Sequence, residues 1–120
     1  MTDSNYKELV QIYDEFKDQG LEILAYPCDQ FGGQESGNSI QIRKFVGERQ
    51  VTFPVMSKVE VNGSDADPAF EYLRDNSVLN GRDIMWNFSK FLVNADGDVV
   101  ASYNPAQSPK SIVDDIKTLL

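Results

Sequence analysis

The apolar run Leu21–Tyr26 is the feature of this sequence that most constrains its fold. All of its residues except Glu22 are apolar, and Pro27 ends it. A short apolar run that is bounded by turn residues is typical of a strand buried on both faces of a parallel sheet. Such a strand needs hydrogen-bonding partners along both edges. The rest of the chain must therefore supply neighbouring strands, and helices that cover both faces of the sheet.

The segments around this run predict a single α/β domain over residues 1–120. Capping residues followed by helical apolar spacing mark four helices, and three further segments are expected to be extended. The expected helices begin near Thr2, Asn38, Asp67 and Ser108, and the other extended segments are Phe53–Met56, Trp86–Val93 and Val99–Tyr103. The apolar sides of the second and last helices are expected to include Ile40, Ile42, Phe45, Val46, Leu119 and Leu120. The last two extended segments should form a hairpin that pairs with one edge of the Leu21–Tyr26 strand, and we expect the partner of the other edge to be missing.

The absence of histidine and the presence of a single cysteine exclude several kinds of site. Without histidine, the 120 residues cannot form a Ser-His or Cys-His nucleophile pair or a His-ligated zinc site. One cysteine cannot form an internal disulfide or a cysteine zinc site. The net charge of −8 disfavours nucleic acid as a partner, because Lys and Arg are needed to neutralise phosphates. We therefore expect neither a bound metal nor a nucleic-acid partner.

The sequence also predicts no membrane span. No apolar run approaches the length of about 18 residues that marks a membrane-spanning helix. The segment Met1–Gly20 is charged throughout and has no apolar centre of the kind found in a secretory signal peptide. These features favour a soluble intracellular protein, and we expect it in the cytoplasm.

Four features could carry chemistry, and each also has a simpler structural explanation. The Gly-rich loop Phe31–Gly37 lacks the lysine and the spacing of a phosphate loop, so a turn-rich loop is favoured. The acidic segment Asp96–Asp98 fits a hairpin turn better than a calcium loop. Trp86 and Asn87 are either a core tryptophan with a strand cap or a functional pair of hydrogen-bond donors. Cys28, which has an acidic neighbour, fits a small buried apolar residue better than a reactive thiol.

Several segments taken together resemble the glutathione peroxidase family. Leu21–Glu35 is similar to the family's signature segment, written LEILAFPCNQFGxQE, and Trp86–Val93 is similar to its WNFxKFLV segment. Lys58–Gly63 matches the KVxVNG segment, and Thr2–Tyr6 matches the opening of the first helix. The similarity extends over residues 2–120 and implies a thioredoxin-like fold with three layers, α/β/α. It also implies reduction of hydrogen peroxide, or of organic and lipid hydroperoxides, by a thiol in oxidative-stress defence.

The resemblance implies a catalytic tetrad, of which three members fall on Gln34, Trp86 and Asn87. The fourth member is a cysteine or selenocysteine that attacks the peroxide. Amide and indole N–H groups can donate to a thiolate or selenolate. Each such hydrogen bond to an ionised group contributes about 1.5–3 kcal/mol, which lowers the pKa of the nucleophile. This arrangement would explain how the chain could serve redox chemistry without histidine.

The peroxidatic residue of the family lies in a segment of the form NVASxCGxT, whose last residue aligns with Thr2. We therefore expect the nucleophile two residues ahead of Met1, and the central first strand of the sheet ahead of that. On this interpretation the sequence is an N-terminally truncated form of the domain and is inactive alone. Selenocysteine is encoded by UGA, which can be read as a stop codon. An open reading frame would then begin at the next methionine codon, Met1. We therefore predict that the gene encodes a selenoprotein.

The resemblance also bears on the reductant. Members that use thioredoxin carry a second cysteine on the next helix, and the segment Phe45–Phe53 has none. Glutathione is therefore expected as the co-substrate rather than thioredoxin, with no other cofactor. The short connection from Gly63 to Trp86 resembles the monomeric, phospholipid-hydroperoxide type.

Two other functions stay open at this point. One is a non-catalytic thioredoxin-like binding module, and the other is a weak thiol peroxidase that uses Cys28 as a secondary thiol. An organellar targeting segment upstream of Met1 is also compatible with the sequence, and would replace the cytoplasm as the location.

Overall fold

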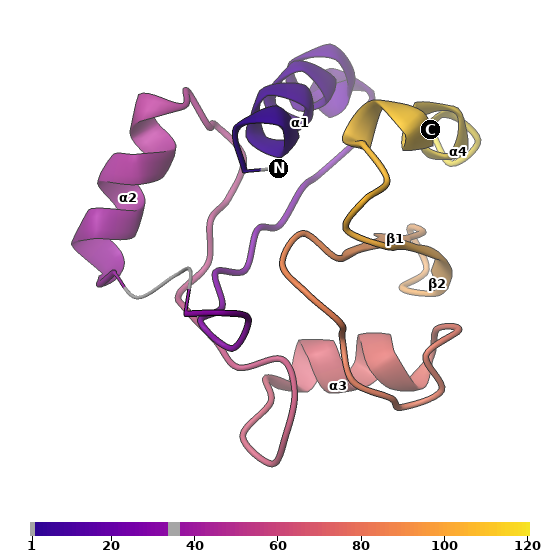
Figure 1. Ribbon diagram of the computed structural model, residues 1–120. Helices are drawn as coiled ribbons and strands as arrows, with labels where there is room; N and C mark the ends of the chain where they lie inside the picture. Colours follow the sequence, from indigo (N-terminus) through magenta and orange to yellow (C-terminus); the bar gives the residue numbers. More distant parts are fainter. Residues whose placement is uncertain (1, 34–36) are drawn as a thin grey trace.

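The computed structural model describes residues 2–33 and 37–120, and the elements alternate along the chain as an α/β protein does (Figure 1). In chain order they are α1 (Thr2–Phe16), the 3₁₀ helix η1 (Lys17–Gln19), α2 (Ser39–Glu48), α3 (Pro68–Asp75), β1 (Lys90–Val93), β2 (Val99–Tyr103), the 3₁₀ helix η2 (Pro109–Ile112) and α4 (Val113–Lys117). The four predicted helical regions are confirmed, and so is the hairpin.

The helices begin and end where local chemistry favours it. The Asn38 side chain accepts a hydrogen bond from the backbone N–H of Gln41, whose side chain in turn accepts from the N–H of Asn38. This capping box satisfies backbone donors that the first turn of α2 would otherwise leave free. Asp67 caps α3 by accepting from the N–H of Ala69. These starts depend on neighbouring residues alone, which is why the sequence predicts them.

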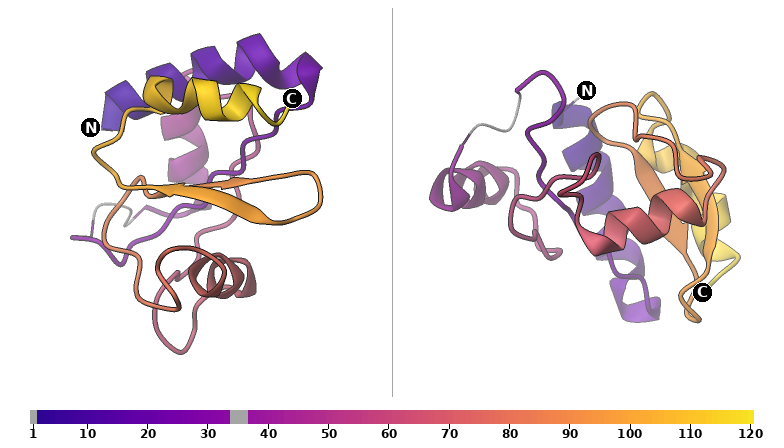
Figure 2. Two further views of the ribbon diagram at one scale, coloured as in Figure 1. Left: turned by 90° about the vertical axis from the view of Figure 1, so that its right-hand side faces the viewer. Right: turned by 90° about the horizontal axis from the view of Figure 1, so that it is seen from below.

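The hairpin separates two helical layers (Figure 2). Successive residues of a strand point to opposite faces. Leu92 of β1, which lies opposite Ala101 of β2, packs with α1, η2 and α4. The preceding residue, Phe91, faces the other way and contacts Phe70 of α3, with 6.5 Å between the ring centroids. The predicted order of layers, helix, sheet and helix, is therefore confirmed.

The Leu21–Tyr26 segment differs from the predicted strand. It is extended but forms only an isolated parallel bridge, between Ala25 and Val55. The N–H of Ala25 donates to Pro54 O at 3.0 Å, and the N–H of Met56 donates to Ala25 O at 2.8 Å. Leu24 is 53% exposed, so burial on both faces is wrong. The physical reason is that the segment pairs along one edge, and β1 and β2 pair only with each other among the described residues.

Three smaller predictions are also wrong. The strand expected to start at Trp86 begins at Lys90. Ile40 is 73% exposed, because α2 turns Ile42 and Val46 toward the protein instead. Leu119 and Leu120 follow the end of α4 and are exposed, because the last helical region is short and begins as the 3₁₀ helix η2.

Candidate functional site

Trp86 and Asn87 lie in a tight turn just ahead of β1. Phe88 has a positive φ of 64°, a conformation that no regular strand accepts. The hydroxyl of Ser89 donates to Trp86 O at 3.0 Å, and the ammonium of Lys90 donates to Phe88 O at 2.7 Å. These two side chains satisfy carbonyls that a strand partner would otherwise bind, so the turn replaces the predicted strand start.

The turn places the side chains of Trp86 and Asn87 against Phe31, which lies four residues after Pro27. The Asn87 side-chain amide donates to Phe31 O at 3.2 Å. The rings of Phe31 and Trp86 have centroids 5.9 Å apart. Phe31 is buried, whereas Trp86 remains 40% exposed, so the interpretation of Trp86 as a core residue is wrong. The indole is instead held on one side and open to solvent on the other.

The start of α1 lies beside the same turn. Tyr6 packs edge-on against Phe88, with the ring centroids 5.7 Å apart, and against Phe45 of α2 at 6.0 Å. The first N–H groups of a helix have no partner within the helix and favour negative charge nearby. The structure therefore brings together the start of α1, the turn with Trp86 and Asn87, and the loop at Phe31.

Cys28 lies near this region but is enclosed. Its side chain is buried, and Sγ lies 3.4 Å from Oε1 of Gln30, to which it donates. The N–H of Gln30 donates back to Sγ at 3.5 Å. A thiol in this setting acts as a small apolar residue. The inert interpretation of Cys28 fits this packing.

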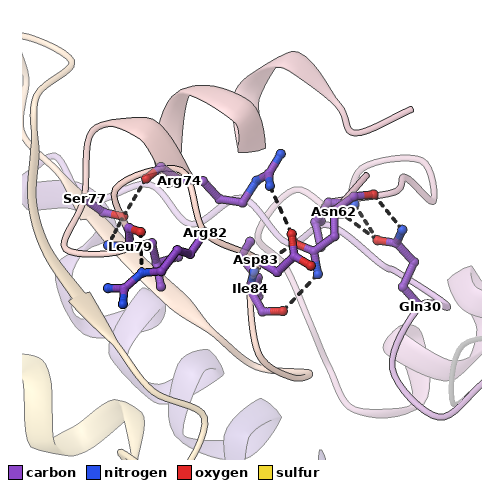
Figure 3. Close-up of polar contacts among 9 residues, drawn as sticks. Gln30, Asn62, Arg74, Ser77, Leu79, Arg82, Asp83 and Ile84 are labelled. Carbon is purple, nitrogen blue, oxygen red and sulfur yellow. Dashed lines mark hydrogen bonds and ion pairs between the residues drawn. The ribbon is translucent and has the colours of Figure 1, made fainter. Parts of the chain in front are cut away.

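Two side-chain amides, those of Gln30 and Asn62, bind backbone groups in this region (Figure 3). The sequence does not predict this role for either of them. Asn62 hydrogen bonds to both backbone groups of Ile84, and Gln30 hydrogen bonds to the backbone of Val61 and Asn62. Both amides occur in segments that resemble the family, Leu21–Glu35 and Lys58–Gly63. That co-occurrence is the one sequence signal that could have pointed to them.

Lys90 is a third residue that sequence reasoning missed. In addition to Phe88 O, its ammonium reaches Gln107 O at 3.5 Å. Partial burial lowers the pKa of Lys90, while the negative charge of Glu8 on α1 opposes that shift. Glu8 itself accepts from the N–H of Lys110 at 3.0 Å. Lys90 therefore joins the turn to the loop before η2.

The predicted site residue Gln34 lies outside the described residues. Within the described part of the chain, no group of Cys, Asp and Glu side chains is arranged to hold a metal ion. No helix among the residues described is both long and apolar enough to cross a bilayer. Open grooves of about 550 and 330 Å³ border α1 and the Asp29–Gln30 segment, and neither is lined by Trp86 or Asn87.

Comparison with known sequences gives a consistent result. The family model described as "Glutathione peroxidase" matches residues 1–74. A protein of Citrus sinensis named "Probable phospholipid hydroperoxide glutathione peroxidase" is 52% identical over 122 residues, which cover 100% of this chain and 73% of the relative. "Probable glutathione peroxidase 8" of Arabidopsis thaliana is 48% identical, with 100% and 73% covered. Another Arabidopsis thaliana relative, also 48% identical, carries the word "chloroplastic" in its name and is covered to 52%.

Solved structures agree with the sequence comparison. The structure described as "Crystal structure of Trgpx in apo form" superposes with a TM-score of 0.76 at 33% identity, covering 96% of this chain and 69% of that one. "Crystal structure of T. cruzi GPX1" also gives 0.76, at 31% identity, with 97% and 71% covered. The expected thioredoxin-like α/β fold is confirmed by these neighbours. The chain belongs to the glutathione peroxidase family, whose members are peroxidases.

Proposed function

We propose that Trp86 and Asn87, together with Gln34, form the hydrogen-bond-donor side of the peroxide-reducing site. The proposal depends mainly on one observation, the turn that holds Asn87 on Phe31 O and the Trp86 ring against Phe31. The contact between Tyr6 and Phe88 supports it, because it brings the start of α1 beside this turn. The family motif puts the peroxidatic residue just ahead of that helix, as a cysteine or selenocysteine.

The proposed chemistry needs a stabilised anion and a stabilised leaving group. The thiolate or selenolate attacks one peroxide oxygen, the O–O bond breaks, and the alkoxide or hydroxide takes a proton and leaves as alcohol or water. Indole and amide N–H groups stabilise the nucleophilic anion before the step and the departing oxyanion during it. A thiol then condenses with the oxidised residue, releasing water, and a second thiol regenerates it as a disulfide forms.

Bulky hydroperoxides are the proposed substrates, in line with the names of several relatives. Trp86 is partly exposed, and its neighbour Met85 is 77% exposed. The turn therefore lies on an open surface, and the described residues do not bury it in a narrow cleft. An open, partly apolar surface suits a lipid or organic hydroperoxide as well as hydrogen peroxide.

Glutathione is the proposed reductant, and the full protein is proposed to act as a monomer. The chain has a single cysteine, and it is buried, so a second thiol that could pass electrons to thioredoxin is not present in the 120 residues. No other cofactor is proposed. The 120 residues cannot form an internal disulfide among themselves, which suits a reducing compartment, and we propose the cytoplasm.

A restoration experiment tests the proposal. Two forms are assayed with glutathione and a lipid hydroperoxide: the 120-residue chain, and the same chain preceded by a family-type first strand ending in Cys-Gly. We expect activity near background from the first and clear turnover from the second. In the active form, Trp86→Phe and Asn87→Ala should each lower kcat by about 10- to 100-fold, since a hydrogen bond to a charged group contributes about 1.5–3 kcal/mol.

Asn76→Ala provides a control, because the Asn76 side chain donates to Tyr72 O at the end of α3 and has no other hydrogen bond among the described residues. Unchanged turnover in both site variants would overturn the proposal. Turnover by the 120-residue chain that Cys28→Ser abolishes would instead identify Cys28 as a thiol peroxidase. No turnover from either form would favour a non-catalytic binding module.

A further inference from the structure

We infer that Asn62, held by Gln30, is a positioning residue for the turn that carries Trp86 and Asn87. The inference rests on the proposed function for its catalytic meaning, since only then does the position of Trp86 affect the reaction. The Lys58–Gly63 segment, which includes Asn62, has no other part in the proposed site. We call the set Gln30, Asn62 and Ile84 the amide clamp (Figure 3).

The contact between Asn62 and Ile84 imitates a strand pair. Oδ1 of Asn62 accepts from the Ile84 N–H at 2.8 Å, and Nδ2 donates to Ile84 O at 2.9 Å. One amide thus satisfies both backbone groups of a buried residue, as a neighbouring strand would. Ile84 lies two positions before Trp86, so the clamp fixes the chain as it enters the turn.

Gln30 fixes Asn62 in the same way from the other side. Its Nε2 donates to Asn62 O at 2.8 Å, and its Oε1 accepts from the N–H groups of Val61 and Asn62 at 2.7 and 3.1 Å. The thiol of Cys28 also donates to this oxygen. The orientation of both amides is therefore set by several backbone partners, and neither is free to rotate.

The clamp closes a ring of contacts around the two donors. Gln30 immediately precedes Phe31, whose carbonyl accepts from Asn87 and whose ring contacts Trp86. From Phe31 the path runs back through Gln30 and Asn62 to Ile84, and then along the chain to Trp86. Because the ring is closed, the backbone at Trp86 cannot move away from Phe31 without breaking a contact of this ring. The geometry thus positions the backbone from which the two proposed donors extend.

Apolar packing alone would not fix the position of the chain at Ile84. Val61 and Ile84 are buried in one cluster with Cys28 and Phe31, which holds the segments together. Such packing has no fixed direction, whereas a pair of hydrogen bonds to one residue sets both register and orientation. Stability and positioning can therefore be separated by experiment.

The fluorescence of Trp86 provides a direct test, because it is the only tryptophan in the chain. The Asn62→Asp variant keeps the shape and the acceptor, but it puts a carboxylate oxygen against Ile84 O in place of a donor. We expect the emission of the folded variant to shift to longer wavelength and its quenching by acrylamide to rise. The largest possible change is that of a Trp86 side chain that goes from 40% exposed to fully exposed. Asn76→Asp, just after the end of α3, is the matched control, with the same substitution, the same charge change and the loss of one donor to a backbone carbonyl.

Gln30→Glu supplies a second variant if Asn62→Asp does not fold. It replaces the donor to Asn62 O by a carboxylate oxygen, on an exposed side chain. The unsubstituted chain gives a further measurement, in which the Ile84 amide should exchange its hydrogen slowly. Emission shifts in the Asn62 or Gln30 variants, with none in Asn76→Asp, would support the inference.

Wild-type emission in the folded variants, or an equal shift in the control, would overturn the inference, as would rapid exchange at Ile84. This test needs no peroxidatic residue. A shifted emission together with full activity in Trp86→Phe and Asn87→Ala would therefore keep the positioning role and refute the proposed function.

Discussion

The two apolar clusters of this protein are built in different ways. The first consists of Ile12, Phe16, Tyr103, Ile112 and Ile116, and it joins helices to the hairpin. The second consists of Cys28, Phe31, Val61 and Ile84, all of which lie outside regular helices and strands. The backbone of the first cluster is satisfied by its own ladders and helical turns. In the second, side-chain amides bind backbone groups of Phe31, Val61 and Ile84, and two of these amides belong to Gln30 and Asn62.

This difference separates the scaffold from the site. Regular elements can be packed by shape and hydrophobicity alone, since their polar groups are already paired. A segment without regular structure must obtain each hydrogen bond from a particular side chain, and that side chain then sets its position. The second cluster therefore depends on particular side chains at more positions, and these side chains set the positions of Trp86 and Asn87. If the two clusters are separable in this sense, a substitution in one should leave the other unchanged.

The largest expected effect is in the first cluster. Phe16 is buried where α1 ends, so Phe16→Ala should lower the free energy of unfolding by about 3–5 kcal/mol through lost transfer energy and a cavity. Urea unfolding followed by circular dichroism measures this loss. The emission of Trp86 in the folded state should not change, because the contacts of Phe16 lie in the other cluster.

Ile40→Ala is the control for this prediction. Ile40 is exposed, and the change should stay within about 0.5 kcal/mol. A shift of Trp86 emission in Phe16→Ala would show that the two clusters are coupled and not separable.

A smaller effect is expected at Lys90, the first residue of β1, whose side chain binds a carbonyl of the turn. Lys90→Met keeps the apolar stem but removes the donor to Phe88 O, and we expect a loss of about 1 kcal/mol after allowing for solvent screening at a half-exposed group. Trp86 emission should shift here, and Lys90→Arg should restore it in part. Lys58→Met, at an exposed lysine with no contact to the turn among its described interactions, should leave emission unchanged. Equal shifts of Trp86 emission in Lys90→Met and Lys58→Met would show that Lys90 does not hold the turn in place.

Tyr103 tests the first cluster by pH. Its hydroxyl donates to Asp115 at 2.7 Å, and burial, followed by this hydrogen bond, raises the pKa of Tyr103 to about 12. The unfolded value is about 10, so the protonated phenol stabilises the fold fully below pH 10, and this contribution is lost as pH rises toward 12. Tyr103→Phe should cost about 1 kcal/mol at neutral pH. The difference in Tm between the two proteins should shrink from pH 9 to 11, and a constant difference would contradict the assignment.

The sequence predicts the starts of the helices far better than the segments that lack regular structure. Helix starts such as Asn38 and Asp67 depend on residues within a few positions, so local chemistry suffices to find them. The Leu21–Tyr26 segment was predicted with the wrong burial because its pairing depends on Phe53–Met56, which lies far along the chain. Its actual pattern of exposure follows from having a partner on one edge.

The site itself could not be worked out from periodicity. Resemblance to a family identifies Trp86 and Asn87, but the sequence predicts a strand where the turn that holds them lies. The positive φ of Phe88 and the reach of the Lys90 side chain decide that turn, and neither leaves a pattern in the sequence. Gln30 and Asn62 were missed for the same reason, since an amide that binds backbone looks like any other polar residue in a loop.

The smallest expected effect lies between α1 and α2, outside both clusters. The guanidinium of Arg49 pairs with Asp3 at 3.0 Å and stacks on the ring of Phe45, 3.4 Å from its centroid. Asp3 is highly exposed, so Asp3→Asn should cost only about 0.5 kcal/mol, and 1 M salt should abolish most of that loss by screening. Unfolding in urea at low and high salt measures both values, with Asp14→Asn as the control at a longer pair of 3.9 Å with Lys17.

A loss well above that of the control, which 1 M salt abolishes, would mean that the ion pair, and not the stacking of Arg49 on Phe45, holds α2 beside α1. Since Phe45 also contacts Tyr6, which contacts Phe88, such a result would extend the support of the turn to charged residues on the surface. The expected small, screened loss instead leaves that support to ring contacts and side-chain amides.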